Sequence, residues 1–103
     1  MNFDTYQAEA IKTRQPRADL LYLCGRLAAE GGEALQEVQN EIYHDRPLDR
    51  TNLILELGDI LWYVANAADV LGVKLETVAL RNIAKLRSRH GETYNPMHYQ
   101  EAA

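Results

Sequence analysis

Helix-breaking residues are rare in this chain and divide it into a few long segments. Pro16, Pro47, Gly72 and Gly91 bound long stretches without proline, and the third proline, Pro96, lies beyond them in the tail. The residue before a proline is pushed out of the α region, and glycine commonly follows the last turn of a helix. No segment alternates apolar and polar residues over enough positions to indicate a β strand. The sequence therefore predicts an all-α fold.

The breaks predict helices over residues 3–14, 18–43, 50–71 and 75–88. Asn2 and Asp49 are the expected N-caps of the first and third helices, and Gly72 is expected to follow the third. Short connections favour a four-helix bundle in which 18–43 and 50–71 form a long helical hairpin. Gly31-Gly32 lies inside the second helix and lowers helix propensity by about 2 kcal/mol, which predicts a kink or a close backbone approach.

The length of 103 residues suits one domain, with a bundle over about 3–89 and an extended or frayed tail over 90–103. The longest stretch without a charged residue, 60–68, has nine residues, too few to span a membrane. The opening residues lack a basic and then apolar leader, so we expect a cytoplasmic protein. The single cysteine, Cys24, excludes an internal disulfide and a thiolate metal cage, and is expected to be packed.

The net charge of −4 argues against a general nucleic-acid binder. The charges are unevenly distributed, with 6 basic and 12 acidic residues up to Gly72 and 5 basic and 3 acidic residues after it. An acidic body with a basic C-terminal segment suits a polyanionic ligand that arrives with metal cations. It equally suits two segments of the chain that pair with each other.

Apolar residues cover two faces of the third expected helix. One broad arc is the expected bundle core, and Leu55 and Trp62 fall on the opposite side. A helix that is apolar almost all round is usually buried on both sides, so a second copy of the chain is expected to cover the second face. The arc consists of Leu53, Leu57, Ile60, Leu61, Val64, Ala67, Ala68 and Leu71.

Acidic side chains form one stripe on each helix of the hairpin. A narrow polar strip expected to face outward on the third helix holds Asn52, Glu56, Asp59, Tyr63 and Asn66, and a stripe on the second helix holds Glu30, Glu33, Glu37 and Glu41. The second stripe borders an apolar arc of Leu20, Cys24, Leu27, Leu35 and Val38. Like charges at these spacings repel, which a bound cation would relieve. The alternative is that the acidic stripe of the second helix binds no cation and is an ordinary solvent-exposed face.

If the two helices pack antiparallel, the Glu-x-x-Glu and Glu-x-x-Asp spacings can bring four carboxylates into one cleft. Such an oxygen-rich site suits Mg²⁺, which proteins normally share with substrate phosphates. On the fourth helix Asn82, Lys85 and Arg89 share a face beside the expected core positions, and they are either an exposed basic face or contacts for a polyphosphate. Those core positions are Leu75, Ala79, Ile83 and Leu86.

The motif sequences LAAEGGEALQEVQ and LILELGDILWYVANAADVLG, followed by NIAKLRSR, resemble the MazG-like all-α nucleoside triphosphate pyrophosphohydrolases. The opening YQAEAIKT is similar to the first helix of that family. The resemblance extends over residues 3–89, and ELGDILWY is its most specific part.

The resemblance implies hydrolysis of a nucleoside triphosphate to the monophosphate and pyrophosphate by attack of water at the α-phosphorus, as in housecleaning of nucleotide pools. It implies that Mg²⁺, with Mn²⁺ as the alternative ion, is held by Glu30, Glu33, Glu56 and Asp59. It places Lys85, Asn82 and Arg89 at the triphosphate and Tyr63 and Trp62 near the nucleotide. Among the catalytic candidates Glu30, Glu33 and Lys85, Glu33 is the first candidate for the general base.

The sequence leaves the preferred base and sugar, the number of metal ions and the choice between dimer and tetramer open. A di-iron carboxylate bundle needs Glu-x-x-His on two helices, and this spacing occurs once, at Glu41 and His44. The other alternative is a non-catalytic helical dimer that binds a nucleotide or a protein through the acidic cleft.

Overall fold

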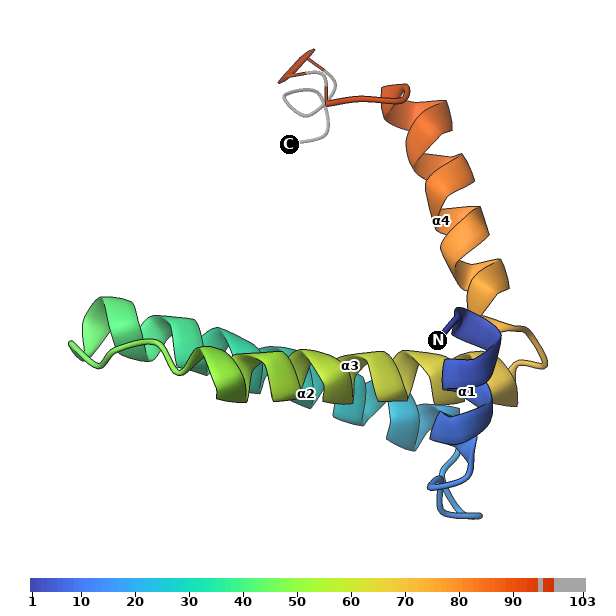
Figure 1. The fold of residues 1–103 in the computed structure, drawn as a ribbon, viewed down its shortest axis with the longest axis horizontal. Coiled ribbons are helices and arrows are strands. Elements are labelled where there is room, and N and C mark those ends of the chain that lie inside the picture. The colour runs from blue at the N-terminus through green and yellow to red at the C-terminus, as the bar shows by residue number, and fades with distance from the viewer. Residues whose placement is uncertain (95, 98–103) are drawn as a thin grey trace.

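The computed structural model describes residues 1–94 and 96–97 and contains four helices in this part of the chain (Figure 1). They are α1 (Phe3–Ile11), α2 (Leu20–Tyr43), α3 (Arg50–Val70) and α4 (Leu75–His90). The described residues form no strand, so the all-α prediction is confirmed, as is the long hairpin of α2 and α3. The last positions of the expected tail, together with residue 95, lie outside the described residues.

Short polar residues begin three of the helices as N-caps. The Asn2 side chain accepts a hydrogen bond from the backbone N–H of Thr5 at 2.8 Å, and Asp49 accepts one from the N–H of Asn52 at 2.9 Å. Both predicted caps are therefore confirmed. Asp19 caps α2 in the same way, so this helix begins at Leu20 rather than at residue 18.

The ends of the helices differ by a few residues from those expected. α1 ends at Ile11 instead of Arg14. After it, the N–H groups of Thr13 and Arg14 bond to the carbonyls three residues back, on Ala10 and Ile11, and these bonds close the chain into a turn. α3 ends before Gly72, whose φ of 76° is the left-handed conformation expected of a glycine that follows a helix. α4 continues to His90, two residues beyond the expected end.

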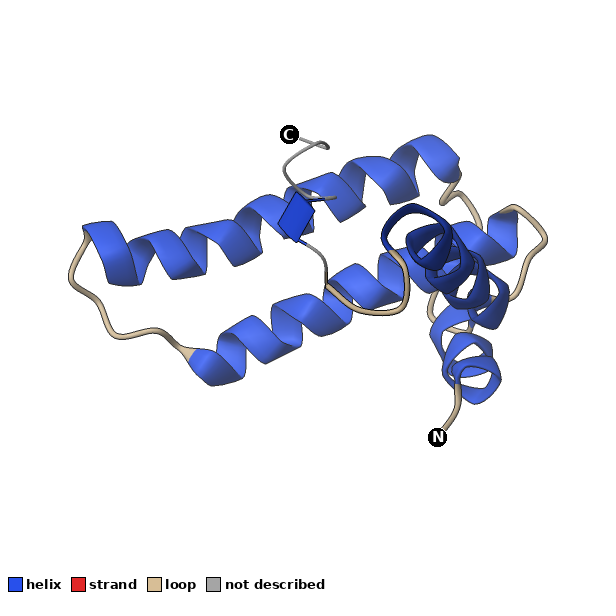
Figure 2. Cartoon of the chain, turned by 90° about the horizontal axis from the view of Figure 1, so that it is seen from above, coloured by secondary structure: helices blue, strands red, loops and turns tan. Residues whose placement is uncertain are grey.

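The hairpin forms the long axis of the molecule, and the other two helices lie at one end of it. α2 and α3 run antiparallel, α1 packs across the C-terminal half of α3, and α4 leaves this corner at a steep angle to the hairpin (Figures 1 and 2). α2 is unbroken through Gly31-Gly32, and a Cβ atom added at either glycine would meet no heavy atom within 4 Å. The expected close backbone approach at this pair is therefore absent within the described chain.

A small core lies where α1, α3 and α4 meet. Ala10, Ala65 and Leu75 are buried there, with Tyr6, Trp62 and Val64 packed against them. The only expected core position of α4 that is buried is thus Leu75. Trp62, which was expected to face a second subunit, is partly buried against this core, and its indole N–H donates to the Thr13 hydroxyl in the turn after α1 at 2.9 Å.

Much of the expected apolar surface is uncovered, because α1 covers one side of α3, α2 covers another, and α4 points away from the rest. From the expected arc of α3, Ala68 is buried, whereas 54% of Leu57, 38% of Leu61 and 64% of Leu71 are exposed. The other expected core positions that the structure leaves exposed are Cys24, Leu35, Val38, Ile83 and Leu86.

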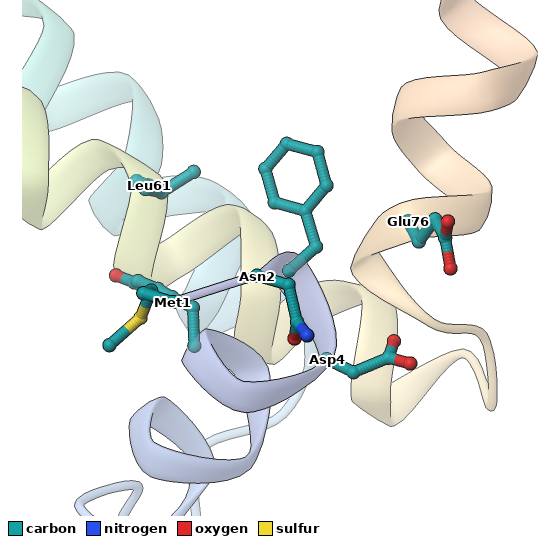
Figure 3. A pocket seen from close by; sticks show the side chains of 7 residues that line it. Met1, Asn2, Asp4, Leu61 and Glu76 are labelled. Atoms are coloured by element: carbon teal, nitrogen blue, oxygen red, sulfur yellow. The ribbon is translucent and has the colours of Figure 1, made fainter.

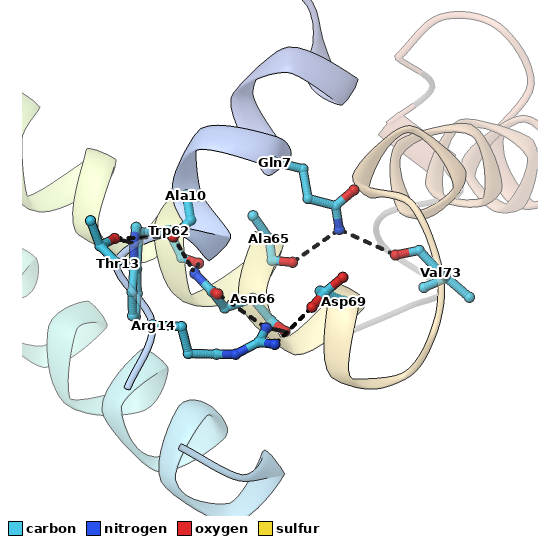
Figure 4. Close-up of polar contacts among 9 residues, drawn as sticks. All are labelled: Gln7, Ala10, Thr13, Arg14, Trp62, Ala65, Asn66, Asp69 and Val73. Atoms are coloured by element: carbon cyan, nitrogen blue, oxygen red, sulfur yellow. Dashed lines mark hydrogen bonds and ion pairs between the residues drawn. The ribbon is translucent and has the colours of Figure 1, made fainter. Parts of the chain in front are cut away.

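Two buried amide side chains fix α1 to the rest of the chain (Figure 4). The Gln7 amide donates to the carbonyls of Ala65 at 3.1 Å and Val73 at 3.2 Å, and its oxygen accepts from the N–H of Leu75 at 2.9 Å. Gln7 therefore connects α1 to α3, to the following loop and to the first residue of α4.

Asn66 is the second buried amide, and it is fully buried rather than part of an outward polar strip. It donates to the carbonyl of Trp62 at 3.0 Å, and its side-chain oxygen accepts from Arg14 at 3.2 Å (Figure 4). Arg14 also forms an ion pair with Asp69 at 2.8 Å. The helical wheel placed Asn66 beside the acidic residues, but the turn after α1 folds over this part of α3.

We expect Gln7→Leu to lower the free energy of unfolding by about 2 to 3 kcal/mol, because it leaves the N–H of Leu75 and the carbonyl of Val73 without their partner in the core. Urea unfolding at a fixed protein concentration measures the effect. Gln15→Leu, at an exposed position in the turn after α1, is the matched control and is expected to change stability by less than about 0.5 kcal/mol. Equal effects of the two variants would contradict this role of Gln7.

Candidate functional site

The antiparallel hairpin brings the two acidic motifs against each other. Glu30 and Glu33 lie near the middle of α2, and Glu56 and Asp59 lie in the first half of α3. The negative charge of Asp59 contributes to the raised pKa of Glu30, so these two side chains interact across the hairpin. We use the term carboxylate site for these four residues.

Glu30 is the most buried carboxylate of the site, with 6% of its surface exposed. One oxygen, Oε1, accepts a hydrogen bond from Arg26 at 3.0 Å, one helical turn earlier, while Oε2 is buried without a partner. Burial raises the pKa of Glu30, and the interaction with the nearby Glu33 carboxyl and the charge of Asp59 raise it further, against the opposing effect of Arg26. Glu30 thus lies buried beside negative charge, whereas Glu33 and Asp59 are exposed.

An asparagine bridges the two acidic stripes further along the hairpin. The Asn52 amide donates to Glu37 on α2 at 2.7 Å and to Oε1 of Glu56 on its own helix at 3.2 Å. The second oxygen of Glu56, Oε2, is buried and has no hydrogen-bond partner. Asn52 therefore holds Glu56 against α2, with one oxygen left for another ligand.

The donor set fits a divalent cation of the Mg²⁺ type. Carboxylate oxygens are the ligands such ions prefer, and the unpartnered oxygens of Glu30 and Glu56 would gain a partner from one. In the part of the chain that the structure describes, no three Asp, Glu, His or Cys side chains converge closely enough to form a metal cage. The acidic side chains thus share one interface without being drawn together around a point.

Of the aromatic residues expected near the nucleotide, both on α3, Tyr63 lies by Arg26 beside the carboxylate site, whereas Trp62 packs against the core of α1, α3 and α4. The Trp62 and Tyr63 rings meet edge to face, with 4.9 Å between their centroids. Tyr63 lies close to Arg26, and its interaction with this guanidinium is the main cause of the raised pKa of Arg26. Arg26 thereby links Tyr63 to Glu30.

The basic residues of α4 are not brought to the carboxylate site within one chain. Asn82, Lys85 and Arg89 are exposed along α4, which projects from the corner of the molecule while the acidic motifs lie along the hairpin (Figure 1). α4 packs on α1 and α3 near its own N-terminus. The structure therefore separates these expected phosphate contacts from the expected metal ligands.

Two residues organise the site in ways that the sequence analysis did not predict: Arg26 was not named, and Asn52 was named only as part of the polar strip. Arg26 precedes Glu30 by four positions, a spacing that places oppositely charged side chains together on a helix, and this signal was present in the sequence. The contact of Asn52 with Glu37 joins residues 15 positions apart on different helices, and it depends on the register of the hairpin. The sequence contains no local signal for that register.

The raised pKa of Glu30 predicts how the stability of the metal-free chain responds to pH. The folded chain keeps the Glu30 proton at a pH where the unfolded chain has released it, so this group's contribution to stability is complete below about 4.5, its ordinary pKa, and is lost as pH rises through the folded pKa. We therefore expect the melting temperature of Glu30→Gln to exceed that of the parent by a margin that grows as pH rises above about 4.5. Thermal unfolding with a chelator between pH 4 and 8 measures the difference, and a constant difference over this range would contradict the expectation.

Comparisons with known proteins identify the family of the chain. Residues 19–94 match the MazG nucleotide pyrophosphohydrolase domain. The Gene 37 protein of Mycobacterium phage L5 is 38% identical over 102 aligned residues, which cover 86% of this chain and 89% of that protein. No solved structure matches. None of the described helices combines the length and the apolar character needed to cross a membrane. The matched domain contains the whole hairpin and α4, and the chain therefore belongs to the MazG nucleotide pyrophosphohydrolase family.

Proposed function

We propose that this chain hydrolyses a nucleoside triphosphate to the monophosphate and pyrophosphate in a reaction that depends on Mg²⁺, with Mn²⁺ as a substitute. The observation that carries the proposal is the meeting of two acidic motifs across the hairpin, with buried, unpartnered oxygens on Glu30 and Glu56. Membership of the family supports a nucleotide as the substrate. The proposed role is the removal of unwanted nucleotides from the cellular pool.

In this proposal Glu30, Glu33, Glu56 and Asp59 hold the cation. When bound, the cation neutralises charge on the phosphates and supplies Lewis acidity at the reacting phosphorus. A water molecule forms the new bond to the α-phosphorus, the bond from this phosphorus to the bridging oxygen breaks, and pyrophosphate leaves with that oxygen. The carboxylate of Glu33, which is exposed, accepts the proton of the water, and the more buried Glu30 is the alternative base.

Nucleotide positioning falls to side chains around the acidic motifs. Tyr63 and Trp62 offer ring edges and faces beside the carboxylate site. Asn82, Lys85 and Arg89 supply donors and positive charge for the triphosphate. Since α4 projects away from the hairpin in one chain, we propose that its basic face meets the substrate in an assembled oligomer.

The uncovered apolar surface supports a homo-oligomer, either a dimer or a tetramer. Exposed large apolar side chains gather on α3 and α4, where the same chain offers no cover, and a second copy of this surface would bury them. They are Ile54, Leu55, Leu57 and Leu61 on α3 and Val78, Leu80, Ile83 and Leu86 on α4. Trp62 contributes less to this surface, because it is partly buried against the core cluster of α1, α3 and α4.

We expect Leu57→Glu to dissociate the oligomer, because it places a charge in the centre of the apolar surface of α3. Light scattering at micromolar concentration measures the mass of the particle. Gln15→Glu adds the same charge at an exposed polar position and is expected to leave the mass unchanged. A monomeric parent protein at these concentrations would refute the oligomer.

The test of the function is pyrophosphate release from a panel of ribo- and deoxyribonucleoside triphosphates, with and without Mg²⁺. The expected products are the nucleoside monophosphate and pyrophosphate in equal amounts, with turnover only when the cation is present. Release of inorganic phosphate would indicate attack at the γ-phosphorus and contradict the proposed reaction. Nucleotide binding without any product would support the non-catalytic alternative.

A further inference from the structure

Arg26 is a basic side chain that the fold places directly against the carboxylate site. It lies one helical turn before Glu30 on α2, and its Nη2 donates to Oε1 of Glu30 at 3.0 Å. The Arg26 side chain is 41% exposed, whereas that of Glu30 is 9% exposed. The guanidinium therefore joins a buried carboxylate to the solvent-exposed edge of the site.

The ion pair satisfies only one of the two oxygens of Glu30. Oε1 is bonded to Arg26, while Oε2 is buried without a hydrogen-bond partner. Glu33 follows on the same helix at a spacing that brings like charges together. A buried carboxylate beside another carboxylate needs a positive charge, and within the described chain the ion pair with Arg26 supplies it.

A divalent cation would compete with Arg26 for this carboxylate. Mg²⁺ takes carboxylate oxygens as ligands, and the oxygen that Arg26 holds is one of the two that Glu30 can offer. A cation bound to Glu30 also neutralises the charge that attracts the guanidinium, and it repels the guanidinium directly. Binding of the cation therefore favours release of Arg26 from Glu30.

A polyphosphate is a suitable second partner for the released guanidinium. Arginine carries five N–H donors in a planar fork that fits the oxygens of a phosphate, and Mg²⁺ is normally shared with substrate phosphates. The Arg26 side chain is long and partly exposed, so it can change partner by rotating its own bonds while α2 stays in place.

Two other parts of the molecule are less suited to phosphates bound at this site. A pocket of about 640 Å³ opens at the start of α1, but Asp4 and Glu76 give it negative charge, and none of the described residues that line it is lysine or arginine (Figure 3). The basic face of α4 projects away from the hairpin (Figure 1). Among the described residues, Arg26 is the basic one that forms an ion pair with a member of the carboxylate site.

We propose that Arg26 has two partners in turn. It pairs with Glu30 until a divalent cation binds, and it then holds a phosphate of the triphosphate. The proposal rests on the cation site and the nucleotide hydrolysis proposed above, and it adds a substrate-binding residue to them. Arg26 opposes binding of the cation in the first arrangement and strengthens binding of the substrate in the second. Its removal therefore has opposite effects on the two ligands.

Two simpler roles of Arg26 predict different results. An ordinary ion pair between residues four positions apart stabilises a helix slightly, so Arg26→Gln would lower the melting temperature a little and change the binding of neither ligand. A role in orienting Glu30 for the cation predicts that Arg26→Gln weakens Mg²⁺ binding. The sign of the effect on Mg²⁺ therefore separates the proposal from both.

The first test measures Mg²⁺ affinity by isothermal titration without a nucleotide. We expect Arg26→Gln to bind Mg²⁺ at least about fivefold more tightly than the parent, which corresponds to the upper end of the range for a partly exposed ion pair. Arg26→Lys keeps the charge and is expected to stay close to the parent. Arg17→Gln removes a basic charge at an exposed position before α2 and is the matched control, with unchanged affinity. Unchanged or weaker binding by Arg26→Gln would overturn the proposal.

The second test measures the binding of inorganic tripolyphosphate at a Mg²⁺ concentration that saturates each variant. This probe carries the phosphates of the substrate without a base, and its binding does not depend on turnover of a nucleotide. We expect Arg26→Gln to bind it about 10- to 100-fold more weakly than the parent, because charge-assisted hydrogen bonds are lost. Arg26→Lys is expected to lie in between, and Arg17→Gln to match the parent.

The two tests also distinguish a failure of this proposal from a failure of the proposed function. Parent-like binding of tripolyphosphate by Arg26→Gln would overturn the second partner of Arg26, whatever the protein hydrolyses. If both expected results were obtained with a protein that releases no pyrophosphate from any nucleotide, they would support the two partners of Arg26, and only the proposed hydrolysis would be wrong.

Discussion

Glu56→Gln is expected to abolish pyrophosphohydrolase turnover while leaving the chain folded and, without metal, at least as stable as the parent. Glu56 carries a buried oxygen without a partner and shares a crowded acidic interface with α2. Replacing a carboxylate by an amide of the same shape removes repulsion between like charges, but it also removes a ligand with the charge that Mg²⁺ requires. Asp59→Asn is expected to behave in the same way.

Three measurements separate loss of the cation from loss of the fold. The first is turnover at saturating Mg²⁺, and the second is the melting temperature with a chelator. The third is the gain in stability when Mg²⁺ is added, which for a bound ion at a hundred times its dissociation constant is about 2.7 kcal/mol. We expect the parent to show this gain and Glu56→Gln to lose it.

Glu41→Gln is the matched control for these variants. Glu41 belongs to the same acidic stripe of α2 but lies near the end of the helix, beside Asp45 and Arg46 in a separate shallow pocket. This substitution removes the same charge from the same stripe and is expected to keep both turnover and the response to Mg²⁺. Parent-like turnover of Glu56→Gln at saturating Mg²⁺ would show that Glu56 is not a metal ligand.

The parts of the fold that local sequence controls were predictable. Asn2 and Asp49 cap helices because their short side chains reach the N–H three residues ahead, and Gly72 adopts a positive φ that other residues avoid. The periodicity of α2 and α3 likewise placed Glu30 and Asp59 on facing stripes, and the charge of Asp59 contributes to the raised pKa of Glu30. Each of these features depends on spacing within a single segment or on the simplest packing of two antiparallel helices.

Features that depend on how α1 and α4 meet the hairpin were not predictable. A helical wheel gives the faces of α3 but not the element that covers each face. Asn66 was placed on an outward strip and is instead fully buried, and Trp62 was placed against a second copy and instead packs partly against the core where α1 meets α3. The direction of α4 follows from Gln7, whose amide fixes the N–H of Leu75. These contacts join residues more than 45 positions apart, and nothing in the local pattern specifies them.

The wheel also overestimated the core. Leu57 and Leu61 belong to the apolar arc of α3, yet a single chain does not cover them. A wheel cannot distinguish a face that packs within the chain from a face that a second copy covers, because both need the same apolar residues. The direction of α4 also could not be read from the wheel. Because α4 leaves Lys85 exposed to solvent, the proposed contact of Lys85 with the triphosphate depends on a second copy of the chain.

Lys85→Ala is expected to lower kcat/KM for the preferred triphosphate by about 30- to 1,000-fold, because loss of a positive charge at the phosphates removes roughly 2 to 4 kcal/mol of transition-state stabilisation. Lys85 is exposed on α4. If it has no role beyond this exposed position, Lys85→Ala is expected to change stability by less than about 0.5 kcal/mol and to leave the kinetics unchanged. Steady-state kinetics and thermal unfolding of the same preparation therefore distinguish the two roles.

Two further variants make the result specific to this position. Lys85→Arg keeps the charge but replaces a compact ammonium by a planar fork, and is expected to recover only part of the loss. Arg87→Ala removes a charge two positions later, on the opposite face of α4, and is expected to retain parent-like kcat/KM. If Lys85→Ala and Arg87→Ala lowered kcat/KM equally, the effect would come from the overall charge of α4, because a contact with the triphosphate requires one face of the helix.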